Sequence, residues 1–158
     1  MKKIKTGIIG ATGFTGSELV RILYHHPDTE LEFITSESRA GEKFSDVHPF
    51  FTGIEEMTLH SIKNLGNFSP DLVFLALPHG ISMEFVKDHM EMDFRIIDLS
   101  GDFRLNSAGD YMEWYQKEHI YPEGIKEAVF GLPEYFGEEI KNAKLVANPG
   151  CYPTSAIL

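Results

Sequence analysis

Residues 4–26 read IKTGIIGATGFTGSELVRILYHH. An apolar, strand-like run over Ile4–Gly10 leads into a glycine-rich turn, and a helical pattern over Ser17–His26 ends just before a proline. Thr15 and Glu18 have the spacing of a capping box at the start of that helix. A strand, a glycine turn and a helix in this order predict the opening of a parallel α/β sheet.

Further apolar runs continue the pattern along the chain. Leu72–Leu77 is apolar throughout, as expected of a strand buried on both faces of a sheet, and Ser82–Met90 has a helical stripe. Residues 101–123 are rich in aromatic side chains without a clear period, and we expect an ordered excursion there. The fold class is therefore α/β, with a doubly wound, mostly parallel, Rossmann-like sheet. The other predicted strands are Leu31–Ser36, Met57–Ile62, Arg95–Leu99 and Lys144–Asn148.

Size and composition limit the possible functions. The chain has 158 residues, 42% of them apolar, and a formal net charge of −10, which disfavours general binding to nucleic acid phosphates. Its single cysteine allows no disulfide within the chain. No apolar run approaches the roughly 20 residues that span a bilayer, and the start of the chain does not resemble a signal peptide. We expect a soluble, cytoplasmic protein with neither a nucleic acid nor a membrane partner.

The glycine turn has the properties of a nucleotide-binding site. Gly10 would allow the tight turn, Gly13 the approach of a pyrophosphate, and Gly16 the packing of helix on strand. The spacing is GxxGxxG rather than GxGxxG, and a glycine-rich turn without a ligand is the alternative. No Gly-Lys-Ser/Thr follows, which argues against an ATP P-loop. The predicted cofactor-binding residues of the turn are Gly10, Thr12, Gly13, Phe14, Thr15 and Gly16.

The end of the second strand bears on the choice of cofactor. NAD enzymes usually carry an acidic residue about 20 positions past the last glycine, but Ser36 stands there, followed by Ser38 and Arg39. Two hydroxyls and a guanidinium suit the 2′-phosphate of NADP, whereas Glu37 would repel it if it pointed inward. These residues favour NADP, the alternative being a polar loop with a stray arginine.

Two loops at later strand ends extend the predicted site. Pro78, His79 and Ser82 follow the central strand and are expected beside the cofactor, although His79 could be a loop histidine without a role. Cys151 lies in the turn NPGCYPT, where Pro153 suits the first turn of a helix. A helix N-terminus favours the thiolate, so Cys151 is a candidate nucleophile, and a buried structural cysteine is the alternative.

Four motifs, GATGFTG, ALPHGIS, DLSGDFRL and NPGCYPTS, resemble in their order and spacing those of the N-acetyl-gamma-glutamyl-phosphate reductase family, which are semialdehyde dehydrogenases of arginine biosynthesis. The resemblance implies that Cys151 is acylated and that the glycine turn, with Ser36, Ser38 and Arg39, holds NADPH. The implied reaction reduces N-acetyl-glutamyl 5-phosphate to N-acetyl-glutamate 5-semialdehyde and phosphate.

The resemblance also implies substrate contacts. Ser100 and Arg104 would line the active site, with an ion pair from Arg104 to Asp98 or Asp102 as the alternative. Asn148 would orient the acyl oxygen, or else only cap a turn.

The family has a second, α+β domain after the cysteine, which supplies a catalytic histidine and most of the dimer contacts. We therefore expect residues 1–150 to form the dinucleotide-binding domain and residues 151–158 to begin the helix that leads into the missing substrate domain. All seven histidines precede Cys151, so this chain is expected to bind cofactor without turnover, and the full-length protein to be a homo-oligomer.

Other functions remain as alternatives. They are a non-catalytic NADP(H)-binding module and a related semialdehyde dehydrogenase or aminoadipyl-phosphate reductase. A short-chain reductase is disfavoured because no tyrosine has a lysine four positions later. No metal site is expected, since CxxC and helically spaced histidine pairs are absent from the sequence. Glu55-Glu56 and Glu138-Glu139 are expected to be solvated surface rather than acid–base pairs.

Overall fold

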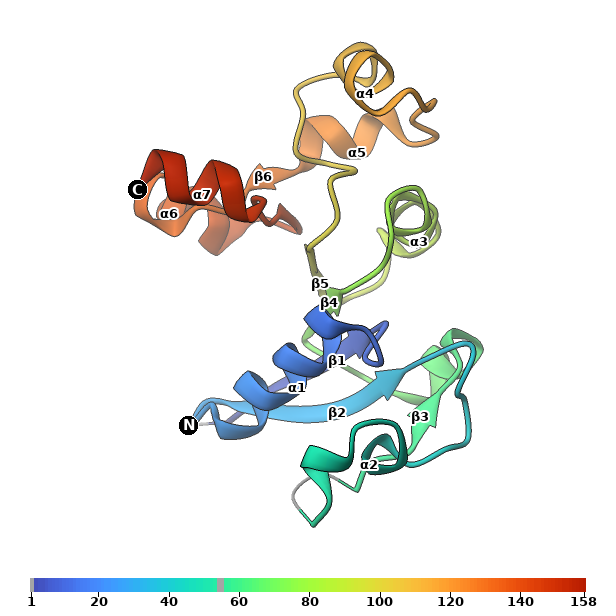
Figure 1. The fold of residues 1–158 in the computed structure, drawn as a ribbon. Helices are drawn as coiled ribbons and strands as arrows, with labels where there is room; N and C mark the ends of the chain where they lie inside the picture. The colour runs from blue at the N-terminus through green and yellow to red at the C-terminus, as the bar shows by residue number, and fades with distance from the viewer. Residues whose placement is uncertain (1, 54–55) are drawn as a thin grey trace. The chain divides into compact units, whose positions relative to one another are not determined.

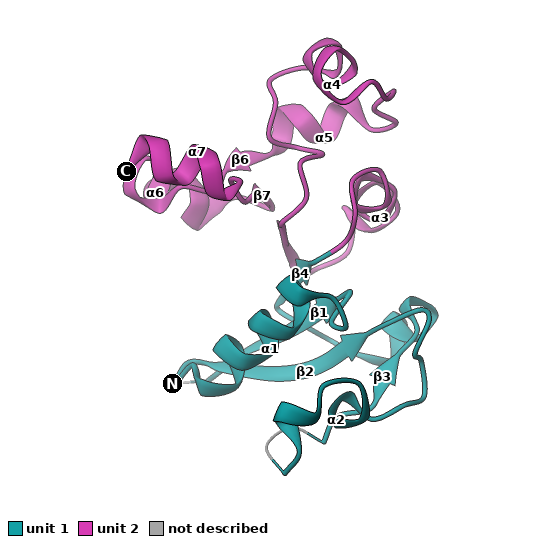
Figure 2. Ribbon diagram, viewed as in Figure 1, with its two compact units in different colours: residues 1–76 teal, residues 77–158 magenta. Residues whose placement is uncertain are grey.

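The computed structural model describes residues 2–53 and 56–158. The chain divides into two compact units, residues 1–76 and residues 77–158 (Figure 2). Glu55 lies outside the described residues, while Glu56, Glu138 and Glu139 are exposed as expected. Among the described residues, no helix is long and apolar enough to cross a membrane.

Unit 1 is built around the strand and helix that the first motif predicts. Its strands lie in the order β3-β2-β1-β4, and each neighbouring pair is parallel (Figure 1). Ile8, Val20 and Ile34 are fully buried in one cluster, so helix α1 packs on the first two strands through the apolar face that the sequence shows. The elements are β1 (Ile4–Ile9), α1 (Phe14–His25), β2 (Thr29–Thr35), α2 (Phe44–Val47), η1 (Pro49–Phe51), β3 (Leu59–His60), η2 (Ile62–Asn67) and β4 (Leu72–Leu75).

Unit 2 continues the alternation of helix and strand. Its strands lie in the order β5-β7-β6 with parallel pairing, and the excursion over residues 101–123 is ordered, as expected. Strand β6 and helix α6 are additions to the predicted elements. The elements are α3 (Ile81–His89), β5 (Arg95–Asp98), α4 (Ala108–Tyr115), α5 (Pro122–Glu127), β6 (Val129–Phe130), α6 (Pro133–Asn142), β7 (Leu145–Ala147) and α7 (Cys151–Ile157).

The predicted fold class is confirmed: the chain is an α/β protein with a Rossmann-like parallel sheet. The predicted capping box is wrong. Helix α1 begins at Phe14 with Gly13 as its N-cap, so Thr15 lies inside the first turn and makes no cap. Glu18 instead pairs with Arg21, at 2.8 Å between Oε2 and Nη2.

Candidate active site

The glycine turn of unit 1 has the geometry that its sequence predicts. Gly10 has a φ of 88°, a conformation that side chains disfavour. A Cβ on Gly16 would lie 2.3 Å from the Gly10 carbonyl oxygen and 2.6 Å from the Ala11 Cα, so only glycine lets α1 approach the turn this closely. A Cβ on Gly13 would have the Gly10 carbonyl oxygen as its nearest neighbour, at 3.9 Å, which leaves open space at the helix start.

The start of α1 can hold an anion. Gly13, Phe14 and Thr15 are exposed, and the first N–H groups of a helix have no partner within the helix. These donors and the helix dipole suit a pyrophosphate. The residues present therefore fit a dinucleotide at this turn.

Of the residues expected to select the cofactor, Ser36 contacts the glycine turn. The Ser36 and Thr12 hydroxyl oxygens lie 3.0 Å apart, which joins the end of β2 to the glycine turn. Arg39 is half-exposed and pairs with Glu42, at 3.1 Å between Nε and Oε2. Ser38 is exposed nearby.

The Glu37 carboxylate is engaged away from these residues. It accepts hydrogen bonds from the Ser61 hydroxyl at 3.1 Å and the Ile62 amide at 2.6 Å, at the start of η2. The repulsion that an inward Glu37 would exert on a 2′-phosphate is reduced by this engagement. Arg39 remains as a half-exposed cation whose ion pair with Glu42 is worth about 0–1 kcal/mol.

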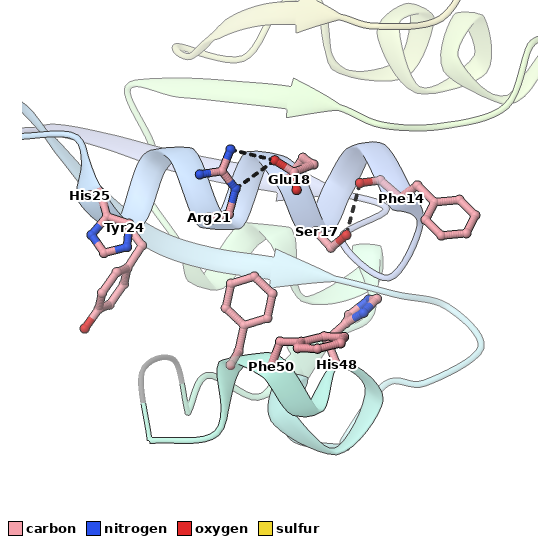
Figure 3. Close-up of a pocket in the computed structure, with 9 residues that line it drawn as sticks. Phe14, Ser17, Glu18, Arg21, Tyr24, His25, His48 and Phe50 are labelled. Carbon is pink, nitrogen blue, oxygen red and sulfur yellow. Dashed lines mark hydrogen bonds and ion pairs between the residues drawn. The ribbon is translucent and has the colours of Figure 1, made fainter.

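His48 also contacts the glycine turn, and the sequence analysis missed it. Its Nε2 lies 3.1 Å from the Thr12 carbonyl oxygen. A lone histidine 36 residues away carries no sequence signal for this contact. Behind it, a cavity of about 470 Å³ runs along α1, with Phe14 at its edge and Phe50 across from Tyr24 (Figure 3).

Unit 2 has its own group of candidate residues, in the loops after β5 and β7. Strands β5 and β7 are parallel neighbours with Asp98 opposite Ala147, so their carboxyl ends lie at the same edge. Arg104 joins the two loops: its Nε donates to the Asn148 carbonyl oxygen and its Nη2 to the Leu99 carbonyl oxygen, each at 2.7 Å. Arg104 therefore binds two backbone carbonyl oxygens and not the carboxylates of Asp98 or Asp102, which were the alternative.

Cys151 is the first residue of α7 and its side chain is exposed. The predicted position at a helix N-terminus is confirmed, and the alternative of a buried structural cysteine is wrong. Asn148 donates its backbone N–H to the Asp98 carbonyl oxygen at 2.8 Å and its side-chain amide to the Pro149 carbonyl oxygen at 3.1 Å. The turn before the thiol is thus tied to the end of β5.

Buried polar groups support these loops from below. Asp98 is fully buried and accepts hydrogen bonds from the Ser82 hydroxyl, and from the Ser100 amide and hydroxyl at 3.1 and 2.7 Å. Burial raises the pKa of Asp98, and these hydrogen bonds oppose the rise. Ser82 was expected beside the cofactor, but it is fully buried and its hydroxyl donates a hydrogen bond to Asp98. Ser100 is buried in the same network.

The loop after β4 completes the set. Pro78 and His79 are exposed, and His79 Nδ1 accepts a hydrogen bond from the Gly101 amide at 2.8 Å. Asp102, which the sequence analysis did not single out, accepts the Gly80 amide at 2.8 Å. Unit 2 therefore holds three loops, residues 78–80, 99–104 and 148–151, in one hydrogen-bonded assembly.

A comparison with protein families identifies this arrangement. Residues 5–143 match the model of the semialdehyde dehydrogenase NAD-binding domain. The chain belongs to this family. The predicted nucleotide-binding class is thereby confirmed.

Curated relatives extend the similarity through the cysteine turn. N-acetyl-gamma-glutamyl-phosphate reductase of Pelotomaculum thermopropionicum is 49% identical, with 98% of this chain and 45% of the relative covered. The [LysW]-L-2-aminoadipate/[LysW]-L-glutamate phosphate reductase of Sulfurisphaera tokodaii is 47% identical, with the same coverage. The chain thus spans about half the length of these relatives, and the resemblance drawn from its motifs is confirmed.

Solved structures share the fold at lower identity. The aspartate semialdehyde dehydrogenase II of Vibrio cholerae has a TM-score of 0.67 at 18% identity, with 96% of this chain and 43% of that chain covered. At this identity the likeness concerns the fold alone.

Proposed function

We propose that this chain is the cofactor-binding and thiol-bearing part of an NADPH-dependent reductase that converts N-acetyl-glutamyl 5-phosphate to N-acetyl-glutamate 5-semialdehyde and phosphate. One observation carries the proposal: the exposed Cys151 stands at the start of α7, and Arg104 and Asn148 tie its loop to the end of β5. This arrangement presents a thiol at the sheet edge where ligands of α/β proteins bind.

The thiol supports a two-step reaction. The Cys151 thiolate attacks the acyl carbon, the bond from that carbon to the phosphate oxygen breaks, and phosphate leaves from a thioester. NADPH, when bound, would supply a hydride for the reduction of the thioester carbon. The carbon–sulfur bond then breaks to give the aldehyde, and Cys151 is released as a thiolate.

The neighbouring residues have supporting roles in this proposal. Arg104 has already committed two of its donors to backbone carbonyls, and it keeps Nη1, which lies 3.1 Å from the position of a Cβ on Gly150, close to the thiol turn. That cation would face the phosphate or carboxylate of the substrate. Ser100 would hold the loop after β5 in place through its hydrogen bonds to Asp98. Asn148 would hold the shape of the turn before Cys151 through its hydrogen bonds to the Asp98 and Pro149 carbonyl oxygens.

NADP rather than NAD is proposed as the cofactor. The start of α1 would hold the pyrophosphate, and Ser36, Ser38 and Arg39 stand where the 2′-phosphate is expected. The half-exposed Arg39 can leave Glu42 at little cost in free energy and gain a doubly charged partner.

A related substrate is the second candidate. The two relatives named above differ by only two percentage points in identity, although one is named for a substrate that is carried on LysW. We place the free acetylated substrate first. Rates with free and carrier-linked acyl phosphates distinguish the two, since a carrier-dependent enzyme would leave the free substrate unreduced.

The decisive experiment traps the thioester in the full-length enzyme. Incubation with the acyl phosphate in the absence of NADPH is expected to add one acetylglutamyl group to Cys151, which mass spectrometry of the digested protein detects. A Cys151→Ser variant is the matched control and should carry no thioester. An unmodified Cys151 in an enzyme that still reduces the substrate would overturn the proposed mechanism.

Separate proposals concern the whole protein. The 158-residue chain alone is expected to bind NADPH without turnover, because no histidine follows Cys151 to act as the acid and base expected from the second domain. Turnover by this chain at an ordinary enzymatic rate, roughly 1–1000 per second, would contradict this. The full-length protein is proposed to be a homo-oligomer, which light scattering measures directly.

A further inference from the structure

His79 is held at one ring nitrogen by the loop after β5. The Gly101 backbone N–H donates to Nδ1 at a nitrogen–nitrogen distance of 2.8 Å. A peptide N–H can only donate, so Nδ1 must offer its lone pair. The proton of the neutral imidazole is therefore on Nε2.

The ring is also fixed in position. A Cβ on Gly101 would lie 2.6 Å from His79 Cε1 and 2.4 Å from the Tyr115 hydroxyl oxygen, so both rings pack directly on this glycine. The His79 and Tyr115 ring centroids are 5.2 Å apart. Turning the imidazole over would break the hydrogen bond from the Gly101 N–H to Nδ1, which favours the observed orientation.

Asp102 holds the turn that carries His79. Its fully buried carboxylate accepts the Gly80 amide at 2.8 Å, the Met83 amide at 3.0 Å and the Tyr111 hydroxyl at 2.8 Å. Helix α3 has no side-chain cap of its own, since Gly80 is its N-cap. Asp102 therefore caps α3 from another loop and sets the path of residues 78–80.

The other ring nitrogen of His79 is Nε2, which the loop does not hold. The side chain is 48% exposed, and within residues 2–53 and 56–158 we find no protein group hydrogen-bonded to Nε2. The loop that fixes the ring also carries Arg104, which is bonded to the turn before Cys151. An N–H donor of defined direction thus belongs to the same assembly as the thiol.

We propose that the loop 100–102 positions His79 as a neutral Nε2–H donor to an oxygen of the acyl phosphate group. This inference rests on the proposed function and gives His79 a defined task in it. His79 binds the substrate, whereas Gly101 and Asp102 are positioning residues. A phosphate oxygen of the cofactor is the other acceptor of this chemistry, and the second experiment below distinguishes the two.

The first test measures the tautomer without any ligand. In the ¹⁵N-labelled chain at about pH 8, long-range ¹H–¹⁵N spectra should show His79 with a bare Nδ1 and a protonated Nε2. His89 is a matched internal control with the opposite expectation, because its Nδ1 lies 2.8 Å from the Phe85 carbonyl oxygen, which can only accept. A proton on Nδ1 of His79 would overturn the inference.

The second test measures the donor's contribution in the full-length enzyme. His79→Asn keeps an acceptor for Gly101, but its shorter amide places no N–H at the position of Nε2. This variant should raise KM for the acyl phosphate about tenfold to a hundredfold while the Kd for NADPH stays the same. His79→Gln, which restores an N–H at similar reach, should recover part of this loss. His89→Gln is the control and should behave as wild type.

The outcomes separate this inference from the proposed function. A higher Kd for NADPH with an unchanged KM for the acyl phosphate would assign His79 to the cofactor and overturn the substrate assignment, as would unchanged values of both. If the wild-type full-length enzyme fails to reduce the acyl phosphate, the proposed function fails, and the substrate role of His79 fails with it. The spectra would still decide the tautomer.

Discussion

Replacing Gly16 by alanine tests whether close packing of α1 creates the nucleotide turn. The new Cβ would lie 2.3 Å from the Gly10 carbonyl oxygen and 2.6 Å from the Ala11 Cα. Ordinary contacts are about 3.5 Å, so the helix and the turn must separate by about 1 Å. Both colliding groups are backbone, and neither can move aside as a flexible side chain would.

The expected cost follows from overpacking. Inserting a methyl group into a site without space costs about 1–3 kcal/mol, and alanine's better helix propensity offsets less than about 1 kcal/mol of it. For a chain of this size, 1–3 kcal/mol lowers Tm by about 2–12 °C. The displaced helix start should also bind the pyrophosphate of NADPH less well.

The assay compares Gly16→Ala with Gly137→Ala in α6, where a Cβ would have no neighbour within 4 Å. Urea unfolding should show Gly16→Ala destabilised by about 1–3 kcal/mol and Gly137→Ala neutral or stabilised by up to about 1 kcal/mol. Calorimetric titration with NADPH should show weaker binding for Gly16→Ala alone. A Gly16→Ala protein as stable as Gly137→Ala, with undiminished NADPH affinity, would refute this reasoning.

Three further predictions concern single side chains. Burial raises the pKa of Asp98 above the ordinary value of an aspartate, so its contribution to folding stability is present at low pH and is lost as the pH rises through the raised pKa. Urea unfolding at a series of pH values should therefore show Asp98→Asn gaining stability relative to wild type over this rise. Parallel curves for the two proteins would contradict this expectation. Tyr111→Phe removes the hydroxyl donor to Asp102 and should lower the free energy of unfolding by about 1.5–3 kcal/mol, whereas a change under 0.5 kcal/mol would show that the bond is dispensable. Arg39→Ala should weaken the binding of NADPH about tenfold without affecting the binding of NADH, as measured by fluorescence titration. Glu42→Gln removes the carboxylate that pairs with Arg39 and should not weaken the binding of NADPH. Equal effects of Arg39→Ala on both cofactors would count against a contact between Arg39 and the 2′-phosphate.

The first strand, the glycine turn and the cysteine turn could be predicted because their information is local. Position 10 favours glycine because of its own positive φ, and Gly150 is the N-cap of the helix that begins at Cys151. The six predicted strands are all present, with ends shifted by one or two residues. Strand β6 has only two residues, which is too short for a pattern to reveal.

The start of α1 shows the limit of local reasoning. Thr15 and Glu18 have the spacing of a capping box, yet the turn makes Gly13 the N-cap and leaves Glu18 to Arg21. The motif describes a possible pairing, and the place where the helix begins decides whether that pairing forms. Here the helix begins at Phe14, directly after Gly13, and Gly16 lies against Gly10 and Ala11 of the turn.

The sequence by itself determined the fold class, the nucleotide turn and the thiol at a helix start, since each depends on residues within a few positions of one another. Only the tertiary structure decided what Arg104, Asp102 and His79 contact. Arg104 reaches a carbonyl 44 residues away, and the Gly80 amide meets a carboxylate 22 residues away. Such contacts form because parallel strands bring distant loops to one edge, where buried donors and acceptors must find partners.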